Sequence, residues 1–142
     1  MVELNHHFAT GKDTDYNWAA ILDLDRIVPC VEGGKVIERE TDEKAKAEIK
    51  VKMGAMSMTF RGTVEIRERD DELHCAVIAV RSKDTGGSGY ANADVRFTLD
   101  NGGGAINTKA TINGKAASMG EGVVVGVLDA LIKDFTTKLG QI

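Results

Sequence analysis

The amino-acid sequence predicts one α+β domain over residues 1–142, in which a curved, seven-stranded antiparallel sheet wraps around a long C-terminal helix. Two short helices are expected after the first strand. Three observations lead to this fold class. Several stretches alternate apolar and polar residues with the period of a strand, short turns rich in glycine and aspartate separate them, and the last apolar residues recur at helical spacing.

The N-terminal part of the chain predicts one strand and then the two short helices. Residues 2–10 are typical of a strand. The side-chain oxygens of residues 13–15 are suited to cap a helix that runs through Leu22. A second helical turn over 25–28 stops before Pro29, because the residue preceding a proline is pushed out of the helical region.

The predicted strands over 44–53 and 56–68 alternate most regularly, after a shorter strand over 35–41. Gly62 lies on the inward row of the second of these, where a glycine often marks a bend or a bulge. The outward row of the first carries Lys44, Lys46, Glu48, Lys50 and Lys52. The inward rows hold Ala45, Ala47, Ile49, Val51 and Met53, then Met56, Met58, Phe60, Val64 and Ile66.

Three further strands are predicted over 73–82, 88–99 and 105–114. The first is apolar on both faces, so its register stays open. The glycine-rich segment 101–104 between the other two is a strong hairpin signal. Their inward residues are Gly89, Ala91, Ala93, Val95, Phe97 and Leu99, then Ile106, Thr108, Ala110 and Ile112.

The rest of the chain, from 118 to 140, predicts a helix about 33 Å long at ~1.5 Å per residue. Ser118 and Glu121 match the capping-box pattern, which places the helix start near 118. Its apolar stripe must be buried, and the inner face of the sheet is the only apolar surface large enough. The stripe holds Val123, Val124, Val127, Leu128, Leu131, Ile132, Phe135 and Leu139.

The small size of many inward residues suggests a cavity between the sheet and the long helix. Alanines and glycines recur on the inward rows, and aromatic residues make up only 5% of the chain. Protein interiors normally pack densely, so a wide concavity lined by small residues either closes up or holds something else. Two interpretations stay open at this point: an apolar ligand site with adaptable methionines, or a tightly curled sheet with an ordinary core.

Composition and charge exclude several classes of protein. With 42% apolar and 28% charged residues, the chain is neither disordered nor a membrane protein. The net charge of −4 argues against a nucleic-acid partner. The first residues, Met1–Asn5, lack the basic and apolar regions of a signal peptide, so we expect a cytoplasmic location.

Few residues suggest catalytic or metal chemistry. His6 and His7 point to opposite faces of a strand and cannot share one metal, and His74 and Cys75 alternate in the same way. Asp23 and Asp25 are better suited to cap the second helical turn than to act as an acid–base pair. We expect no catalytic residue and no metal site.

The cysteines and the outer lysines have ordinary structural interpretations. Cys30 and Cys75 are isolated in sequence, and we expect both to be small buried thiols rather than a disulfide. The row of lysines on the strand over 44–53 is typical of a solvated face that blocks strand aggregation. A docking surface for an anionic membrane or an acidic partner is the alternative.

The chain resembles the carbon monoxide dehydrogenase CoxG family of the START-like helix-grip (SRPBCC) superfamily. The resemblance rests on Trp18-x-x-Ile21-x-Asp23, on Cys30-x-x-Gly33, on the segment 54–62, on Glu68-x-Asp70, and on the pieces Gly89-x-Ala91 and Asn113–Ala116. The chain departs from the family at Glu32, where a proline is usual. Many members also carry a C-terminal extension thought to reach the membrane, whereas this sequence stops at Ile142.

The resemblance implies a helix-grip fold and a non-enzymatic carrier of a hydrophobic small molecule, with an isoprenoid quinone as a candidate. It also implies an accessory role to a carbon monoxide dehydrogenase-type molybdenum hydroxylase. No cofactor or nucleic-acid partner, at most peripheral membrane contact, and a monomer or homodimer are expected. An aromatase- or cyclase-like enzyme, or a ligand-free interaction protein, are the alternatives. The candidate ligand-binding residues are Trp18, Ile27, Val51, Met53, Met58, Phe60, Val64, Ala93, Val95, Phe97, Thr108, Met119, Val123, Val127 and Leu131.

Overall fold

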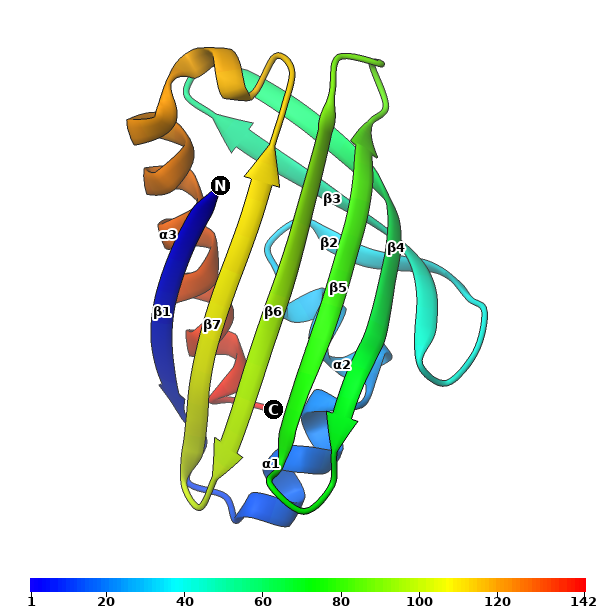
Figure 1. The fold of residues 1–142 in the computed structure, drawn as a ribbon, viewed down its shortest axis with the longest axis vertical. Helices are drawn as coiled ribbons and strands as arrows, with labels where there is room; N and C mark the ends of the chain where they lie inside the picture. Colours follow the sequence, from blue (N-terminus) through cyan, green and yellow to red (C-terminus); the bar gives the residue numbers. More distant parts are fainter.

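The computed structural model describes all 142 residues and contains seven strands, three α-helices and two short 3-10 helices (Figure 1). The α+β fold class predicted from the sequence is confirmed. In chain order the elements are β1 (Val2–Ala9), α1 (Thr14–Ile21), α2 (Leu24–Ile27), η1 (Val28–Cys30), β2 (Gly34–Arg39), β3 (Lys44–Met53), β4 (Met56–Asp70), β5 (Cys75–Asp84), β6 (Tyr90–Asp100), β7 (Gly103–Ile112), η2 (Ala117–Met119) and α3 (Glu121–Leu139).

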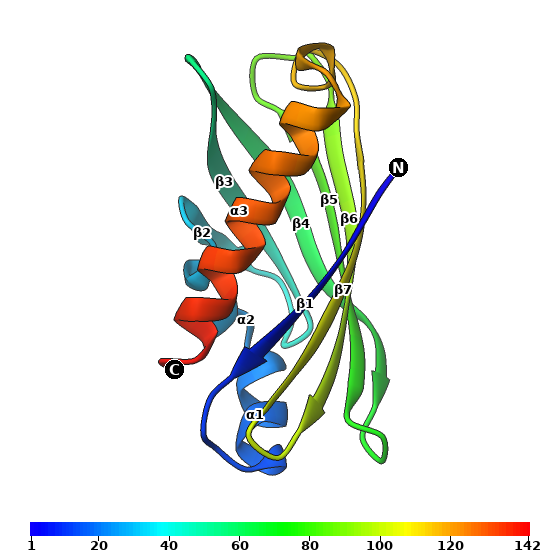
Figure 2. The same ribbon diagram turned by 90° about the vertical axis from the view of Figure 1, so that its left-hand side faces the viewer.

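The seven strands form one antiparallel sheet in the order β1-β7-β6-β5-β4-β3-β2. Strands β2 to β7 follow one another as a meander, and β1 joins the far edge beside β7, where Leu4 lies opposite Thr108. The sheet is strongly curved, and α3 lies across its concave face (Figure 2). Helices α1 and α2 cover one end of the sheet (Figure 1).

The register of β5, open from the sequence, is settled by its neighbours. Ala76 and Ile78 face inward and share the core with Phe97. Val77 faces outward, where Arg67 and Arg96 line a groove with it, and it is only 7% exposed. Both faces of the strand are therefore covered, which explains the ambiguous pattern.

Strand ends differ from the predicted ones where the backbone turns. β5 begins at Cys75, two residues later than expected, because His74 adopts a left-handed conformation with φ 54°. Gly89, expected on an inward row, lies in the turn before β6 with φ 146°.

The long helix also starts later than predicted, and the proposed capping box is wrong. Ser118 lies in η2, where its hydroxyl donates to the carbonyl of Lys115 at 2.6 Å. Gly120 follows with φ 98°, a conformation that breaks the helical path, and α3 begins at Glu121 without a side-chain cap.

Gly62 marks a close approach of two strands rather than a bulge. It pairs regularly with Ala47 on β3 and Ser82 on β5. A Cβ atom at this position would lie 1.9 Å from the carbonyl oxygen of Arg81, so no other residue fits without moving the backbone. The irregular pairings of β4 and β2 fall elsewhere, between Ile66 and Glu68 and between Val36 and Glu38.

The core consists of two clusters at opposite ends of the sheet. The larger, which we call the short-helix end, joins α1, α2 and the last turns of α3 to β1 and to β3–β7, and has 18 buried residues, including Trp18, Leu24 and Phe97. The smaller, the hairpin end, joins the β3–β4 hairpin to the start of α3, and has six buried residues, including Met53, Phe60 and Val124.

Candidate functional site

A cavity of about 260 Å³ lies between the concave face of the sheet and α3. Of its 32 lining residues 25 are hydrophobic, so the space is suited to an apolar guest. The lining draws on both core clusters, with Phe60 from the hairpin end and Phe97 and Phe135 from the short-helix end. The cavity is therefore a gap in the middle of the core, bracketed by aromatic rings.

Short side chains on neighbouring strands create this gap. Ala93 of β6 lies directly opposite Ala110 of β7, and Ala91 precedes it on the same inward row. Ala47 and Gly62, paired between β3 and β4, line the opposite wall. An engineered cavity of about 150 Å³ is enough to hold benzene, so this one has room for a larger molecule.

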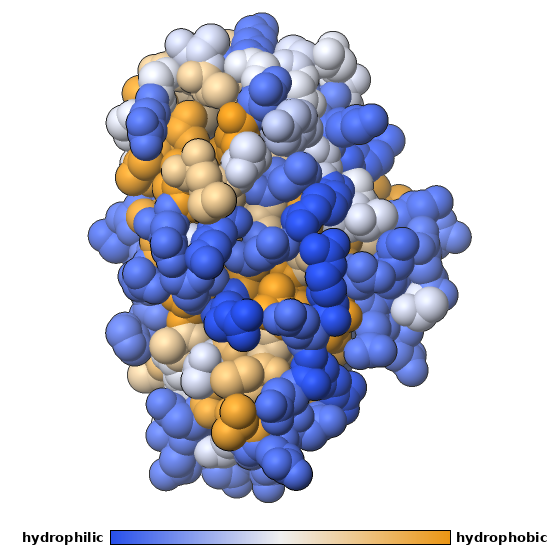
Figure 3. Space-filling model, viewed as in Figure 1, coloured by the Kyte–Doolittle hydropathy of each residue, from blue (hydrophilic) through white to orange (hydrophobic).

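The middle of α3 is less buried than its two ends, because it spans the cavity. Val124 and Phe135 are 5% and 9% exposed. Between them Val127, Leu128 and Leu131 line the cavity and are only half-buried. Apolar surface also gathers on the outside over the N-terminal half of this helix (Figure 3, upper left), where Val123 is 40% exposed.

Only five lining residues have polar side chains: Glu48, Thr63, Ser82, Asn92 and Thr108. Glu48, Thr63 and Asn92 alternate with inward residues and so belong to the outer row. Glu48 accepts hydrogen bonds from Arg61 at 2.6 and 3.1 Å, which lower the pKa of its carboxyl group.

The two inward hydroxyl groups differ in their partners. Ser82 donates to the carbonyl oxygen of Ala91 at 2.6 Å. The Oγ1 atom of Thr108 is buried and has no hydrogen-bond partner in the protein. Thr108 is 5% exposed, and it stands between Leu4 of β1 and Val95 of β6.

A polar contact fastens the middle of α3 to the edge strand β1. The Nε2 atom of His6 lies 2.7 Å from Asp129, and Lys133 binds the other carboxylate oxygen at 2.9 Å. Hydrogen bonds from Lys133 and then His6 lower the pKa of Asp129. His7 is exposed on the other face of β1, as predicted.

Eleven of the fifteen candidate ligand-binding residues line the cavity. They are Ile27, Val51, Met53, Phe60, Val64, Ala93, Val95, Phe97, Thr108, Val127 and Leu131. Three of the other four lie at the hairpin end: Met58 is buried in the core there, Met119 lies in η2, and Val123 points partly to solvent.

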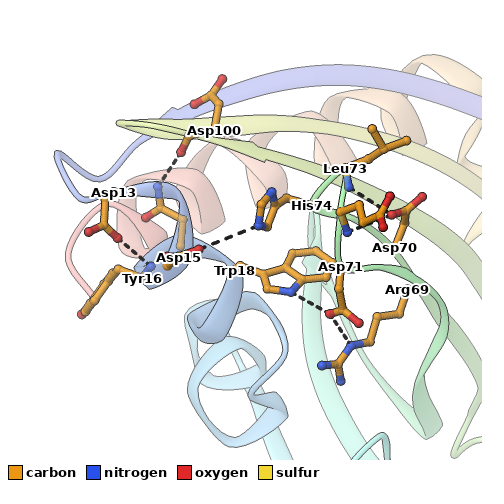
Figure 4. Close-up of polar contacts among 12 residues, drawn as sticks. Asp13, Asp15, Tyr16, Trp18, Arg69, Asp70, Asp71, Leu73, His74 and Asp100 are labelled. Atoms are coloured by element: carbon orange, nitrogen blue, oxygen red, sulfur yellow. Dashed lines mark hydrogen bonds and ion pairs between the residues drawn. The ribbon is translucent and has the colours of Figure 1, made fainter.

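Trp18, the fourth, lies at the short-helix end and does not line the cavity (Figure 4). Its indole N–H donates to Asp71 at 3.0 Å, and its ring meets His74 edge to face at 5.5 Å. Asp71 also accepts a hydrogen bond from Arg69 at 2.9 Å, and these two donors lower the pKa of its carboxyl group. Trp18 therefore joins α1 to the β4–β5 turn.

Several lining residues were not among the candidates. Ile78 and Val80 were omitted because the register of their strand was open, and Leu128 and Ile132 share the apolar stripe that held Val127. The apolar stripe of the helix points to Leu128 and Ile132, whereas the pattern of the strand does not decide for Ile78 and Val80. Val28 begins the short 3-10 helix η1 and Val31 follows its end, where no periodic pattern points to them.

The other polar and thiol groups of the molecule have structural surroundings. Asp13 and Asp23 cap α1 and α2, both as predicted. Asp25, the other predicted cap, lies inside the first turn of α2. Cys30 is buried, which raises the pKa of its thiol, whereas Cys75, expected to be buried, is partly exposed on the outer face.

The outer lysines are partly neutralised by neighbouring glutamates. Lys46 lies 3.4 Å from Glu38 of β2, the neighbouring strand.

Nowhere do three or more histidine, cysteine or carboxylate side chains gather to hold a metal ion. No helix has the length and apolar character needed to cross a membrane.

Comparisons with known proteins agree with this architecture. The chain matches a solved conserved protein from Geobacillus kaustophilus with a TM-score of 0.84 and 21% identity, over 99% of this chain and 93% of that one. It matches the ZhuI aromatase/cyclase from Streptomyces sp. R1128 with a TM-score of 0.64 and 11% identity, over 99% and 92% of the two chains. A START superfamily protein from Mycobacterium smegmatis matches with a TM-score of 0.60 and 8% identity, over 98% and 94%.

At these identities the solved structures establish the fold alone. No curated protein matches the chain in sequence. The family described as the carbon monoxide dehydrogenase G-subunit (CoxG) matches residues 7–141, nearly the whole chain. The chain therefore belongs to the carbon monoxide dehydrogenase CoxG family.

Proposed function

We propose that this protein is a non-catalytic carrier that holds a hydrophobic small molecule, such as an isoprenoid quinone, between the sheet and α3. The observation that carries the proposal is the apolar cavity of about 260 Å³ in the middle of the core. A globular protein normally fills such a space, because lost packing contacts and unburied apolar surface destabilise the fold.

The energetics favour a ligand that is apolar but also makes some further contact. Burying ~300 Å² of apolar ligand surface contributes roughly 7 kcal/mol at about 25 cal/mol per Å². Micromolar affinity needs about 8 kcal/mol net of the cost of immobilising the ligand. A hydrogen bond in the cavity, or an apolar tail outside it, is therefore part of the proposal.

The side chains that face the cavity support a ligand carrier rather than an enzyme. An aromatase- or cyclase-like reaction needs acid–base groups that face the substrate. The inward residues that line the cavity carry two hydroxyl groups, Ser82 and Thr108, and no histidine, lysine or carboxylate. His6, on the inward row of β1, is bound to Asp129 and is not part of the lining. Glu48, the one carboxylate in the lining, belongs to the outer row and is bound to Arg61. The enzyme alternative therefore has no acid–base side chain on the inward rows of the lining.

The partner and the location are proposed from the family. Its name supports a role as an accessory to a carbon monoxide dehydrogenase-type molybdenum hydroxylase. We place that role in the cytoplasm. A ligand-free interaction protein is the remaining alternative, and it would use the outer face that carries Lys50 and Lys52, for which no ion pair is present.

The test compares ligand binding by the wild type and by a variant with the cavity filled. Purified protein is incubated with a naphthoquinone that carries one isoprene unit, and native mass spectrometry measures the bound fraction. Ala93→Phe places a ring inside the cavity, whereas Thr111→Phe adds the same ring on the exposed outer row of β7. We expect the first variant to lose binding and the second to retain it.

Two results would contradict the carrier proposal. One is wild-type protein that stays empty after purification and after addition of the quinone. The other is equal binding by the wild type and Ala93→Phe, which would place the ligand elsewhere on the molecule.

A further inference from the structure

The cavity contains one hydrogen-bonding side chain that the protein leaves without a partner. Of the two inward hydroxyl groups, that of Ser82 is engaged by Ala91 at 2.6 Å. That of Thr108 has no protein partner, although the residue is 95% buried, with 5% of its surface exposed. Buried polar groups are almost always hydrogen-bonded, so an unpartnered hydroxyl in the wall of an apolar cavity points to a ligand contact. The oxygen itself is covered by protein, and a ligand in the cavity reaches it when the Thr108 side chain turns to another χ1 rotamer.

The surroundings of Thr108 determine which chemical group of a ligand can bind there. Its neighbours across the sheet are apolar, Leu4 on one side and Val95 on the other. No charged side chain faces the cavity on the inward rows. A carboxylate or a phosphate would be buried there without a counter-charge, which is strongly unfavourable. A neutral carbonyl or hydroxyl oxygen suits the site, because a threonine hydroxyl both donates and accepts.

The volume limits the part of the ligand that is enclosed. Benzene, with six heavy atoms, occupies an engineered cavity of about 150 Å³. A cavity of about 260 Å³ scales to a group of roughly ten heavy atoms, the size of two fused six-membered rings. Any longer chain on the ligand must leave the cavity.

We propose that the hydroxyl of Thr108 is the anchor that selects neutral ring compounds bearing a carbonyl or hydroxyl oxygen, over pure hydrocarbons and over acids. The proposal rests on the carrier function proposed above and names the chemical class of its ligand. The apolar lining supplies affinity for the rings, and Thr108 distinguishes ligands by their oxygen atom.

The experiment uses two probes of nearly the same shape, the ketone 1-tetralone and the hydrocarbon tetralin. Their dissociation constants are measured by methyl NMR titration of the wild type, Thr108→Val and Ser82→Ala. The wild type is expected to bind the ketone about threefold to tenfold more tightly than tetralin, the usual net contribution of one hydrogen bond. Thr108→Val keeps the shape of the side chain without its hydroxyl, and is expected to lose the preference.

The control variants distinguish the loss of the Thr108 hydroxyl from a general change in the cavity wall. Ser82→Ala removes a hydroxyl that the protein already satisfies and is expected to keep the preference. Thr108→Ser retains the hydroxyl and is expected to keep it too. The melting temperature of the empty Thr108→Val protein is expected to rise, because the variant no longer buries an unpaired polar group.

The outcomes distinguish this inference from the carrier proposal. Equal binding of the two probes by the wild type, or a preference that survives in Thr108→Val, overturns the role of Thr108 and leaves the carrier function standing. Failure of the wild type to bind either probe overturns both. Should Thr108→Val not fold, Thr108→Ala replaces it with the same expected loss of preference.

Discussion

The two ends of the molecule are built from the same strands and the same helix, but they pack differently. The short-helix end has 18 buried residues and four of the buried aromatic side chains, namely Phe8, Trp18, Phe97 and Phe135. The hairpin end has six buried residues and one aromatic, Phe60. The cavity lies where the two clusters should meet.

This difference separates the part that stabilises the fold from the part that accommodates a guest. At the short-helix end, α1 and α2 supply side chains such as Ile21 and Leu24 that fill the curve of the sheet. Towards the hairpin end, α3 is the only α-helix over the sheet, and alanines line the cavity beneath it. One helix packed against small side chains cannot fill a concavity of this width.

Truncating a leucine should have a large effect at the short-helix end and a small one beside the cavity. Leu24 is fully buried, so Leu24→Ala is expected to lower the free energy of unfolding by about 2–5 kcal/mol. Leu131 lines the cavity and is half-buried, so Leu131→Ala should cost about 1 kcal/mol. Chemical denaturation of both variants measures the difference, and equal losses would show that the two regions pack alike.

Enlarging an alanine should have opposite effects in the two places. Ala76 is 1% exposed in the larger cluster, so Ala76→Leu should destabilise the protein by about 1–3 kcal/mol through overpacking. Ala93 faces the cavity, and Ala93→Leu should instead stabilise the empty protein by about 0.5–2 kcal/mol. Thermal unfolding of the two variants gives the sign directly, and a destabilised Ala93→Leu would mean that the space is not free.

A substitution in α3 sharpens the contrast along the helix itself. Gly126 lies in the half of α3 nearer the hairpin end, with open space where a Cβ would be. Gly126→Ala is therefore expected to raise the free energy of unfolding by up to ~1 kcal/mol through helix propensity. Gly122, also in open space but in the first turn, should give a smaller gain. Hydrogen exchange of the α3 amides should slow in Gly126→Ala, and unchanged exchange would contradict this interpretation.

The contact between His6 and Asp129 gives the smallest predicted effect, and it depends on pH. Lys133 and His6 lower the pKa of Asp129 in the folded protein below its unfolded value. The stabilisation is thus fully present above the unfolded value, about 3.9, and is lost as the pH falls through the lower folded value.

Asp129→Asn tests that sign. The variant should melt below the wild type at pH 7, and the two melting temperatures should converge in acid. A gap that stays constant down to pH values of about 2 would contradict the assignment, because the carboxylate would then be protonated in both folded and unfolded wild type.

Much of the fold could be predicted from the sequence because most strands have one solvent-exposed face and one buried face. The alternation of lysine with apolar residues over β3 was enough to assign its inward row. The start of α3 could not be predicted in the same way, because the Ser118–Glu121 spacing does not report that Gly120 adopts a positive φ. β5 stayed ambiguous because charged side chains cover the outward Val77.

The direction of side chains could be predicted as far as it follows from strand alternation. Thr108 and Ala93 were placed inward by their strands, and both line the cavity. Trp18 was assigned to the ligand site, yet its partner Asp71 lies in a turn 53 residues away, and no local pattern reveals such a contact. The volume of the cavity depends on the curvature of the whole sheet, which side-chain sizes alone do not determine.

The tight approach at Gly62 means that the wall of the cavity depends at this point on the lack of a side chain. The other side chains that line the cavity can change in size, since each of them changes only part of the cavity volume. A methyl on Gly62 would instead meet the oxygen of Arg81 at 1.9 Å and force β4 and β5 apart. Ligand preference can thus change through many residues of the cavity wall, whereas the pairing of β4 with β5 requires a glycine at this position.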